Sequence, residues 1–374
     1  IYDDYYRQNR WEIDRRTPLA GNPSSDLTTW DAARFAEICT KYHQLALSEP
    51  ETLKETGLAQ FEEILEGEKK SRNIRPTLFD FLVFRAIDYF SGEKPRSTLP
   101  SVSFKINDKK FFAPVPDFIK LPLTGGDEGF FEFQALKLYQ EVLRFHAGDR
   151  DHTDALVDAD LARLAWVHQK STLPDKDQLY KEALVNSIHT WENQPVSAGI
   201  IYKLVSHLQS EGNKYDPLHP DAYRWELKEA LEWAEMCIRQ YPGTDGAHNC
   251  AILAEELKSV SVQSSGHEAV VPGKASLALI RYKNTERIWF RVIALKPEEA
   301  TGNAGTDQEE LLKGYLKKTV IQSWEQPLPP ESDYRQHCAE IALPALKPGY
   351  YVVLASSIPS FDTSSPITWW DVWS

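Results

Sequence analysis

The sequence predicts a chain of mixed α + β class, in which an α-helical, tetratricopeptide-like region precedes an antiparallel, immunoglobulin-like β-sandwich. The chain has 374 residues, which is more than one hydrophobic core usually serves. Apolar residues recur with the 3.6-residue period of helices up to about residue 260, and with the two-residue period of strands after residue 262. Between them lies the polar segment 261–268, which contains Gly266. We therefore expect a helical region over residues 1–262 and a sandwich over residues 265–374.

The helical region is predicted from segments with an apolar stripe. Residues 31–47, 75–90, 129–149 and 156–170 each repeat apolar side chains at helical spacing. Asp31 is suited to the start of the first helix, and Pro76 is suited to the start of the second. Repeated prolines interrupt this pattern over residues 91–123, which we interpret as a long connection with short extended pieces.

A repeat signal follows in residues 178–258. Two Glu-Ala-Leu triplets place Ala183 and Ala230 each 12 residues before a proline, Pro195 and Pro242. Small residues on one helix let a second helix pack closely on it, as in tetratricopeptide-like hairpins. The segment 213–225 then lies as an insertion between two helices of the second unit. Two unrelated helices that both end before a proline are the alternative.

The sandwich is predicted from alternating apolar and polar residues after residue 262. The strand-like segments are 276–284, 287–295, 319–328, 337–346, 350–357 and 367–373. Residues 267–271 can supply a seventh strand. About seven strands in about 110 residues, separated by Pro, Gly, Asn and Ser turns, are typical of immunoglobulin-like sandwiches. Residues 309–318 interrupt the strands and predict a short helix in a connection.

Charge and hydropathy exclude some classes of partner. The formal net charge of −13 disfavours nucleic acid and anionic membrane surfaces, because both repel an acidic protein. No stretch approaches the roughly 18 consecutive apolar residues of a membrane span, and residues 1–16 lack the apolar core of a signal peptide. We expect no nucleic-acid partner, and membrane association only through an anchor outside this chain.

The four cysteines are Cys39, Cys237, Cys250 and Cys338. Their spacing is neither that of a zinc site nor that of a CxxC redox motif. Cys237 and Cys250 flank the turn YPGTDG and can meet across a helical hairpin. They then form either a disulfide or a pair of buried thiols, and the sequence leaves both open.

Candidate ligand sets were sought among acidic residues and histidines. The acidic segment 149–160 resembles a calcium loop, but Asp154 stands where an EF-hand needs glycine and Asp160 where it needs a bidentate glutamate. An acidic helix start is the favoured interpretation. His146 and His152 lack further ligands at metal-binding spacing, and no two carboxylates are singled out as a glycosidase pair. We predict no catalytic, cofactor-binding or metal-ligating residues, and therefore no enzyme.

The chain also resembles a known family over essentially its whole length. The segments that carry the resemblance include YYRQNRWEIDRRT, RPTLFDFLVFRAIDYF, YDPLHPDAYRWELKEALEWAEMCIRQYP and LKPGYYVVLASS. They resemble the N-terminal region of bacterial alpha-2-macroglobulin family proteins of the Bacteroidetes type. The resemblance implies that residues 265–374 are the first macroglobulin domain of a large periplasmic or cell-envelope lipoprotein. It also implies endopeptidase inhibition by trapping, with protein partners that are other domains of the same chain and, through the full-length protein, proteases.

The reactive machinery of that family does not map onto this chain. Its Cys-x-Glu-Gln thioester is approached only by Cys338-Ala339-Glu340-Ile341, and isoleucine has no carboxamide to condense with the thiol. We expect Cys338 to be a core residue of a strand. The predicted function is that of a non-catalytic structural and interaction region of such an inhibitor. The alternatives are a free-standing peptide- or glycan-binding module and, least favoured, a glycoside hydrolase.

Overall fold

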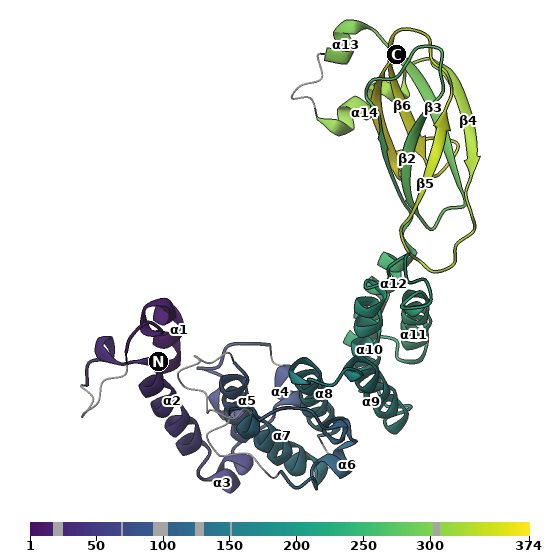
Figure 1. Cartoon of the computed structure of the whole chain (residues 1–374). Coiled ribbons are helices and arrows are strands. Elements are labelled where there is room, and N and C mark those ends of the chain that lie inside the picture. Colours follow the sequence, from purple (N-terminus) through teal and green to yellow (C-terminus); the bar gives the residue numbers. More distant parts are fainter. Residues whose placement is uncertain (18–24, 69, 93–103, 124–130, 150–151, 302–306) are drawn as a thin grey trace. The chain divides into compact units, whose positions relative to one another are not determined.

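The structure is a computed structural model that describes residues 1–17, 25–68, 70–92, 104–123, 131–149, 152–301 and 307–374 (Figure 1). The chain forms two compact units, Ile1–Ile200 and Ile201–Ser374. Long helices follow one another up to Lys258, and the described strands begin at Ser261. The predicted fold class, a helical region followed by an antiparallel β domain, is confirmed. Among the described helices, none is both long and apolar enough to cross a membrane.

The first unit is built from helices. Its described elements are α1 (Tyr2–Ile13), η1 (Leu27–Thr29), α2 (Ala32–Ala46), α3 (Pro50–Glu55), η2 (Leu58–Phe61), α4 (Ser71–Ile74), α5 (Leu78–Ser91), η4 (Lys109–Phe112), α6 (Val115–Phe118), α7 (Phe131–Ala147), α8 (Thr153–Lys170) and α9 (Lys176–Thr190). The helices predicted over 31–47, 75–90, 129–149 and 156–170 correspond to α2, α5, α7 and α8. Asp31 caps α2 as expected, since its carboxylate accepts a hydrogen bond from the Arg34 N–H at 2.8 Å.

Two details of the first unit differ from the sequence prediction. Helix α5 begins after Thr77, which forms a reciprocal capping box with Asp80. In the described part of the predicted connection 91–123, a short extended piece at Ile106 forms a β-bridge with Ser171, and the helical turns η4 and α6 follow it. Prolines favour such a turn at its start, because the first helical residues need no N–H donor, and Pro114 and Pro116 stand at the start of α6.

An insertion separates two of the three helices that precede the sandwich. They are α10 (Ser197–Gly212), α11 (Glu226–Gln240) and α12 (Asp245–Lys258). Residues 213–225 contain no helix or strand and separate α10 from α11, as the sequence predicts. The two repeat alanines are not equivalent, because Ala230 is fully buried whereas Ala183 is only partly buried.

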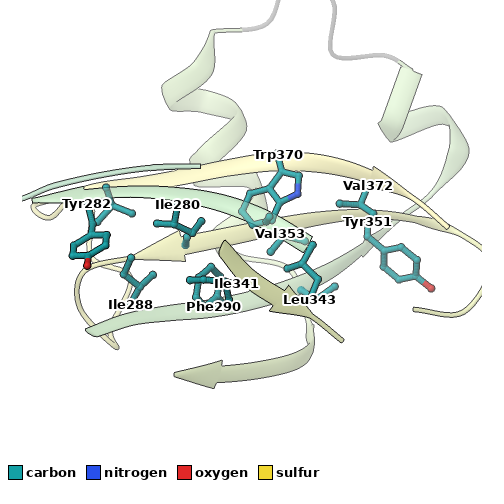
Figure 2. Close-up of a cluster of buried hydrophobic side chains, with 14 of the residues drawn as sticks. Ile280, Tyr282, Ile288, Phe290, Ile341, Leu343, Tyr351, Val353, Trp370 and Val372 are labelled. Atoms are coloured by element: carbon teal, nitrogen blue, oxygen red, sulfur yellow. The ribbon is translucent and has the colours of Figure 1, made fainter. Parts of the chain in front are cut away.

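The β domain is a sandwich of two antiparallel sheets. Its strands are β1 (Ser261–Gly266), β2 (Ser276–Lys283), β3 (Arg287–Leu295), β4 (Val320–Pro327), β5 (His337–Leu343), β6 (Tyr350–Ser356) and β7 (Ile367–Trp373). The sheets have the orders β1-β2-β5 and β4-β3-β6-β7, and every strand pair is antiparallel. Inward side chains of both sheets, such as Ile280, Phe290 and Val353, form one core (Figure 2). The fold is immunoglobulin-like, with the fourth strand beside the third rather than on the opposite sheet as in constant-type domains.

The predicted boundary and the predicted seventh strand need correction. Residues 261–266 of the polar segment form β1, which pairs with β2 along its whole length. Residues 267–271 form no strand and contribute one bridge, from Ala269 to Trp373. Strand β1 fits here because Val262 points into the core and because Gly266 leaves room for the Trp370 indole, which a side chain at this position would overlap. Helix therefore gives way to strand at residues 259–260.

The outer face of the larger sheet is covered by helices. The predicted helix 309–318 is present as α14 (Gln308–Leu316), and α13 (Pro297–Thr301) precedes it in the same β3–β4 connection. Tyr315 of α14 packs with Ile293, Val352 and Leu354 in a second cluster on this face. Strand β6 is consequently buried on both sides, which explains its nearly continuous apolar sequence.

Substitution of Tyr351 tests whether its ring belongs to the sandwich core. It is 8% exposed between the sheets, and its hydroxyl donates to the Lys347 carbonyl at 3.0 Å. Tyr351→Ala is expected to lower the free energy of unfolding by about 3–5 kcal/mol, because it removes a large buried ring. The control Tyr351→Phe loses only the hydrogen bond and should cost about 1 kcal/mol. Urea unfolding of both variants measures the difference, and equal small losses would contradict the placement.

Candidate functional site

An open groove lies within the first unit, among η4, α6, α8 and α9. Its volume is about 540 Å³. One wall is apolar and includes Pro114, Val115 and Ile119 of the η4–α6 segment. The α9 wall carries Ala183, Asn186 and Ser187, and Trp191, which follows α9, also lines the groove.

A buried ion pair forms the floor of the groove. Arg163 of α8 is fully buried, and its Nε donates to Asp160 Oδ1 at 2.9 Å. Its Nη1 donates to the Phe111 carbonyl at 2.6 Å, and its guanidinium lies 4.4 Å from the centroid of the Phe118 ring. Arg163 thus binds the η4–α6 wall to α8. Because loss of either partner would leave a buried charge unpaired, the groove is preformed rather than assembled by a ligand.

The groove offers polar groups as well as apolar surface. Its described lining residues include no histidine or cysteine, and the cations among them are Lys120 and Arg163. Asp160 is the only carboxylate among them and is already paired with Arg163. A glycosidase would need a second, opposed carboxylate. Asn186, Ser187 and Thr190 offer amide and hydroxyl groups that can hydrogen-bond a ligand.

In the second unit, Arg335 joins the helices to the sandwich. It lies in the β4–β5 connection and is 8% exposed. Its Nε donates to the Arg224 carbonyl at 3.1 Å, and its two terminal nitrogens donate to the carbonyls of Gly212 and Tyr223. The guanidinium also lies 4.5 Å from the centroid of the Tyr215 ring. Removal from water lowers the pKa of Arg335, an effect that the charge of Asp333 partly offsets.

We call Arg335 and its three carbonyl partners the Arg335 clamp. A second contact, made by Asn284, supports the same junction. Asn284, in the β2–β3 turn, donates from Nδ2 to the Leu257 carbonyl at 2.7 Å and to the Ser259 carbonyl at 3.0 Å. Asn284 adopts a positive φ of 54°, which asparagine tolerates better than most residues. Asn284 thereby holds the end of α12 against the sandwich from the β2–β3 turn, whereas Arg335 acts from the β4–β5 connection.

Next to the clamp lies a cluster that the sequence did not reveal. Among the described residues, Glu331, Asp333 and His337 have potential ligand atoms within 4.8 Å of one another. His337 Nε2 lies 2.8 Å from Asp333 Oδ1, and Arg224 pairs with Glu331 at 3.2 Å and with Asp333 at 3.9 Å. Arg224 already supplies the positive charge that these carboxylates need, so a divalent cation would have to displace it. The arrangement is that of an ion-pair network which fixes the β4–β5 connection.

The pairing of Arg224 with Glu331 has no sequence signal, because the two residues are 107 positions apart. The cluster itself is local, since Glu331 and Asp333 are two residues apart and Asp333 and His337 are four residues apart. Such spacing is common on exposed surfaces and does not by itself indicate a ligand set.

The acidic segment 149–160, for which an acidic helix start was favoured over a calcium loop, has carboxylates with separate partners. Residues 150–151 lie outside the described part of the chain. The remaining acidic groups point to separate partners, in the pairs Asp149–His152 at 2.7 Å, Asp158–Arg75 at 3.6 Å and Asp160–Arg163 at 2.5 Å. The other candidate histidine, His146, is buried and binds Asp80 Oδ1 at 2.7 Å, which connects α7 to α5.

The cysteines divide into an exposed thiol and buried ones. Cys338 is exposed, so its predicted place in the core is wrong. Ile341 and Leu343 set the inward phase of β5, and the two-residue period puts Cys338 with Glu340 on the outer face. Cys237 and Cys250 are both buried.

Comparison with known proteins assigns no family. No family model matches the chain, and no curated protein matches it. Among solved structures, the chain is similar to the crystal structure of the CARDB domain of a Pyrococcus furiosus protein in complex with di-metal ions. That match has 14% identity over 31% of this chain and 91% of that chain, with a TM-score of 0.18. A solution structure of the same domain has 13% identity over 31% and 93%, also with a TM-score of 0.18. Values this low indicate no function for this chain.

Substitution of Arg335 tests the clamp. Arg335→Met keeps much of the side-chain volume but removes the side-chain donor of the Tyr223 and Arg224 carbonyls, and it leaves the Gly212 carbonyl with the Tyr215 N–H. We expect the free energy of unfolding of the second unit to fall by about 3–5 kcal/mol. The control Arg239→Met, at an exposed position of α11, should change it by less than about 0.5 kcal/mol. Thermal or urea unfolding compares the two variants, and equal effects would show that the clamp does not hold the unit together.

Proposed function

We propose that this chain is a non-catalytic interaction region whose helical unit binds a peptide segment in the groove among η4, α6, α8 and α9. The observation that carries the proposal is that this groove is preformed, with a floor fixed by the buried Arg163–Asp160 pair. A preformed concave site lowers the entropic cost of binding.

The chemistry of the two walls supports a peptide as the ligand. The Pro114–Ile119 wall offers apolar contact to side chains, and the α9 wall offers Asn186, Ser187 and Thr190. An extended peptide needs both, because its side chains bury apolar surface while its main-chain N–H and C=O groups require hydrogen-bond partners.

We further propose that the parent protein is a macroglobulin-like inhibitor of the periplasm or cell envelope. The support is the resemblance in sequence together with the order of the two parts, a helical region and then an immunoglobulin-like sandwich. On this proposal the sandwich is the first macroglobulin domain, and the bound peptide belongs to another domain of the same chain. A free-standing peptide-binding module is the second candidate, because the groove alone supports it equally.

The groove is tested with a substitution that fills it. Random dodecapeptides displayed on phage are selected against the wild-type chain, and the selected peptides are titrated against Ala183→Trp. We expect at least about a 10-fold loss of affinity, or roughly 1.4 kcal/mol, since the indole occupies the groove. The control Ala165→Trp, on an exposed part of α8 outside the groove lining, should bind normally. Failure to select any peptide, or equal binding to both variants, would contradict the proposed function.

Reactivity of Cys338 tests the expectation that this chain alone carries no thioester and traps no protease. Because Ile341 stands where a thioester needs glutamine, the exposed Cys338 thiol is expected to react with iodoacetamide equally before and after methylamine treatment. Trypsin and elastase incubated with the chain should keep their full activity toward small and protein substrates. A thiol that appears only after methylamine, or a protease shielded from large substrates, would contradict this reading.

A further inference from the structure

The helical hairpin of the second unit places two cysteines side by side. Cys237 lies in the last turn of α11 and Cys250 lies in the second turn of α12. Both side chains are fully buried on the packed faces of their helices, and the two thiols are close enough to shift each other's pKa. Neither residue takes part in the groove or in the Arg335 clamp.

Local structure brings the two thiols together. The helices are joined by a short turn in which the Tyr241 N–H donates to the Cys237 carbonyl at 2.9 Å, and Gly243 has a φ of +81°. The Thr244 hydroxyl then caps α12 by accepting from the Ala247 N–H at 3.2 Å. Such a turn fixes the register of the two helices independently of the sandwich.

Small side chains allow the close approach that a disulfide requires. The face of α11 toward the hairpin core carries the buried Ala230 and Ala234 besides Cys237, and α12 carries the buried Ala247 and Ala254 besides Cys250. Disulfides need Cα atoms about 4.4–6.8 Å apart, and alanine-lined helix pairs pack at the short end of interhelical distances. Cys237 and Cys250 belong to these same buried faces of the two helices.

We propose that Cys237 and Cys250 are a modification site that forms an intramolecular disulfide when the chain folds in an oxidising compartment with a disulfide-bearing oxidant. The bond cross-links α11 to α12, the hairpin whose C-terminal end is bound to the sandwich by Asn284. This inference does not rest on the proposed peptide-binding function.

The chemistry is thiol–disulfide exchange, and it balances with a small disulfide such as oxidised glutathione. The Cys237 thiolate attacks one glutathione sulfur, which forms a mixed disulfide and releases the first glutathione thiolate. The Cys250 thiolate then attacks the Cys237 sulfur, which forms the protein disulfide and releases the second. The two thiol protons end on the two glutathione molecules, so the cysteines are oxidised and the oxidant is reduced.

Burial decides when the exchange takes place. Both thiols are fully buried in the folded hairpin, so the exchange takes place during folding or local opening, and native reduced protein should react slowly. In the opened hairpin either cysteine can attack first, and the balance of the reaction is the same.

Counting labelled thiols tests the proposal directly. The complete chain is refolded with oxidised and reduced glutathione, denatured without reductant, alkylated with iodoacetamide and weighed. Of the four cysteines, we expect only Cys39 and Cys338 to be labelled, and all four after reduction. Peptide mapping should recover the Cys237–Cys250 linkage. Four labels without reductant, or a linkage through Cys39 or Cys338, would overturn the proposal.

Single variants separate a cross-link from a packing effect. The oxidised wild type is expected to melt at least about 5 °C above the reduced form, because the bond restricts the unfolded chain. Cys237→Ser and Cys250→Ser should each abolish this difference, whereas Cys338→Ser should keep it. A difference that survives in Cys237→Ser would contradict the assignment. Peptide binding in the groove is expected to be the same in both redox states, so failure of this proposal is distinguishable from failure of the proposed function.

Discussion

The second unit depends on one buried guanidinium. Arg335 is removed from water, which costs free energy for a cation, and it recovers that cost by binding three main-chain carbonyls at once. One of them, that of Gly212, lies at the end of α10, where helix carbonyls lack intrahelical partners and the helix dipole favours positive charge. The other two belong to the insertion 213–225. An irregular segment without secondary structure is thereby ordered by a residue of the sandwich.

This interaction explains why the compact units do not coincide with the change from helix to strand. The chain divides between Ile200 and Ile201, although the secondary structure changes after Lys258. Hydrophobic periodicity reports which face of an element is buried and says nothing of which neighbours bury it. The insertion 213–225 has no periodicity at all. Its attachment depends on long-range contacts from Arg335 and on the Arg224–Glu331 ion pair, which no local pattern encodes.

The parts of the fold that the sequence predicted are those with strong periodicity. The helices α2, α5, α7 and α8 and the strands β2 to β7 have enough apolar residues to define their period and face. Strand β1 was missed because its sequence, SVQSSG, has one inward apolar residue, Val262, and low strand propensity. It forms because pairing with β2 satisfies its backbone and because Trp370 covers Gly266. Cys338 was misplaced by a phase error of one residue, which reverses the face of a strand.

The candidate sites were less predictable than the fold. Asp160 drew attention as part of an acidic segment, and Ala183 as part of a repeat, but their shared place in the groove arises only when η4 and α6 fold against α8 and α9. Proline-rich sequence indicated a connection there and did not show that it forms a wall. For Cys237 and Cys250 the sequence did predict that the two residues meet across a hairpin, but it left open whether they form a disulfide.

Because Arg335 binds the segment that precedes α11 and Asn284 binds the end of α12, we expect the α11–α12 hairpin and the sandwich to unfold together. Native-state hydrogen exchange of the complete chain, measured as a function of denaturant, tests this directly. The slowest amides of α11, α12, β2 and β6 are expected to converge on one opening free energy. Hairpin amides that open at a clearly lower free energy than the sandwich, with no convergence as denaturant rises, would contradict it.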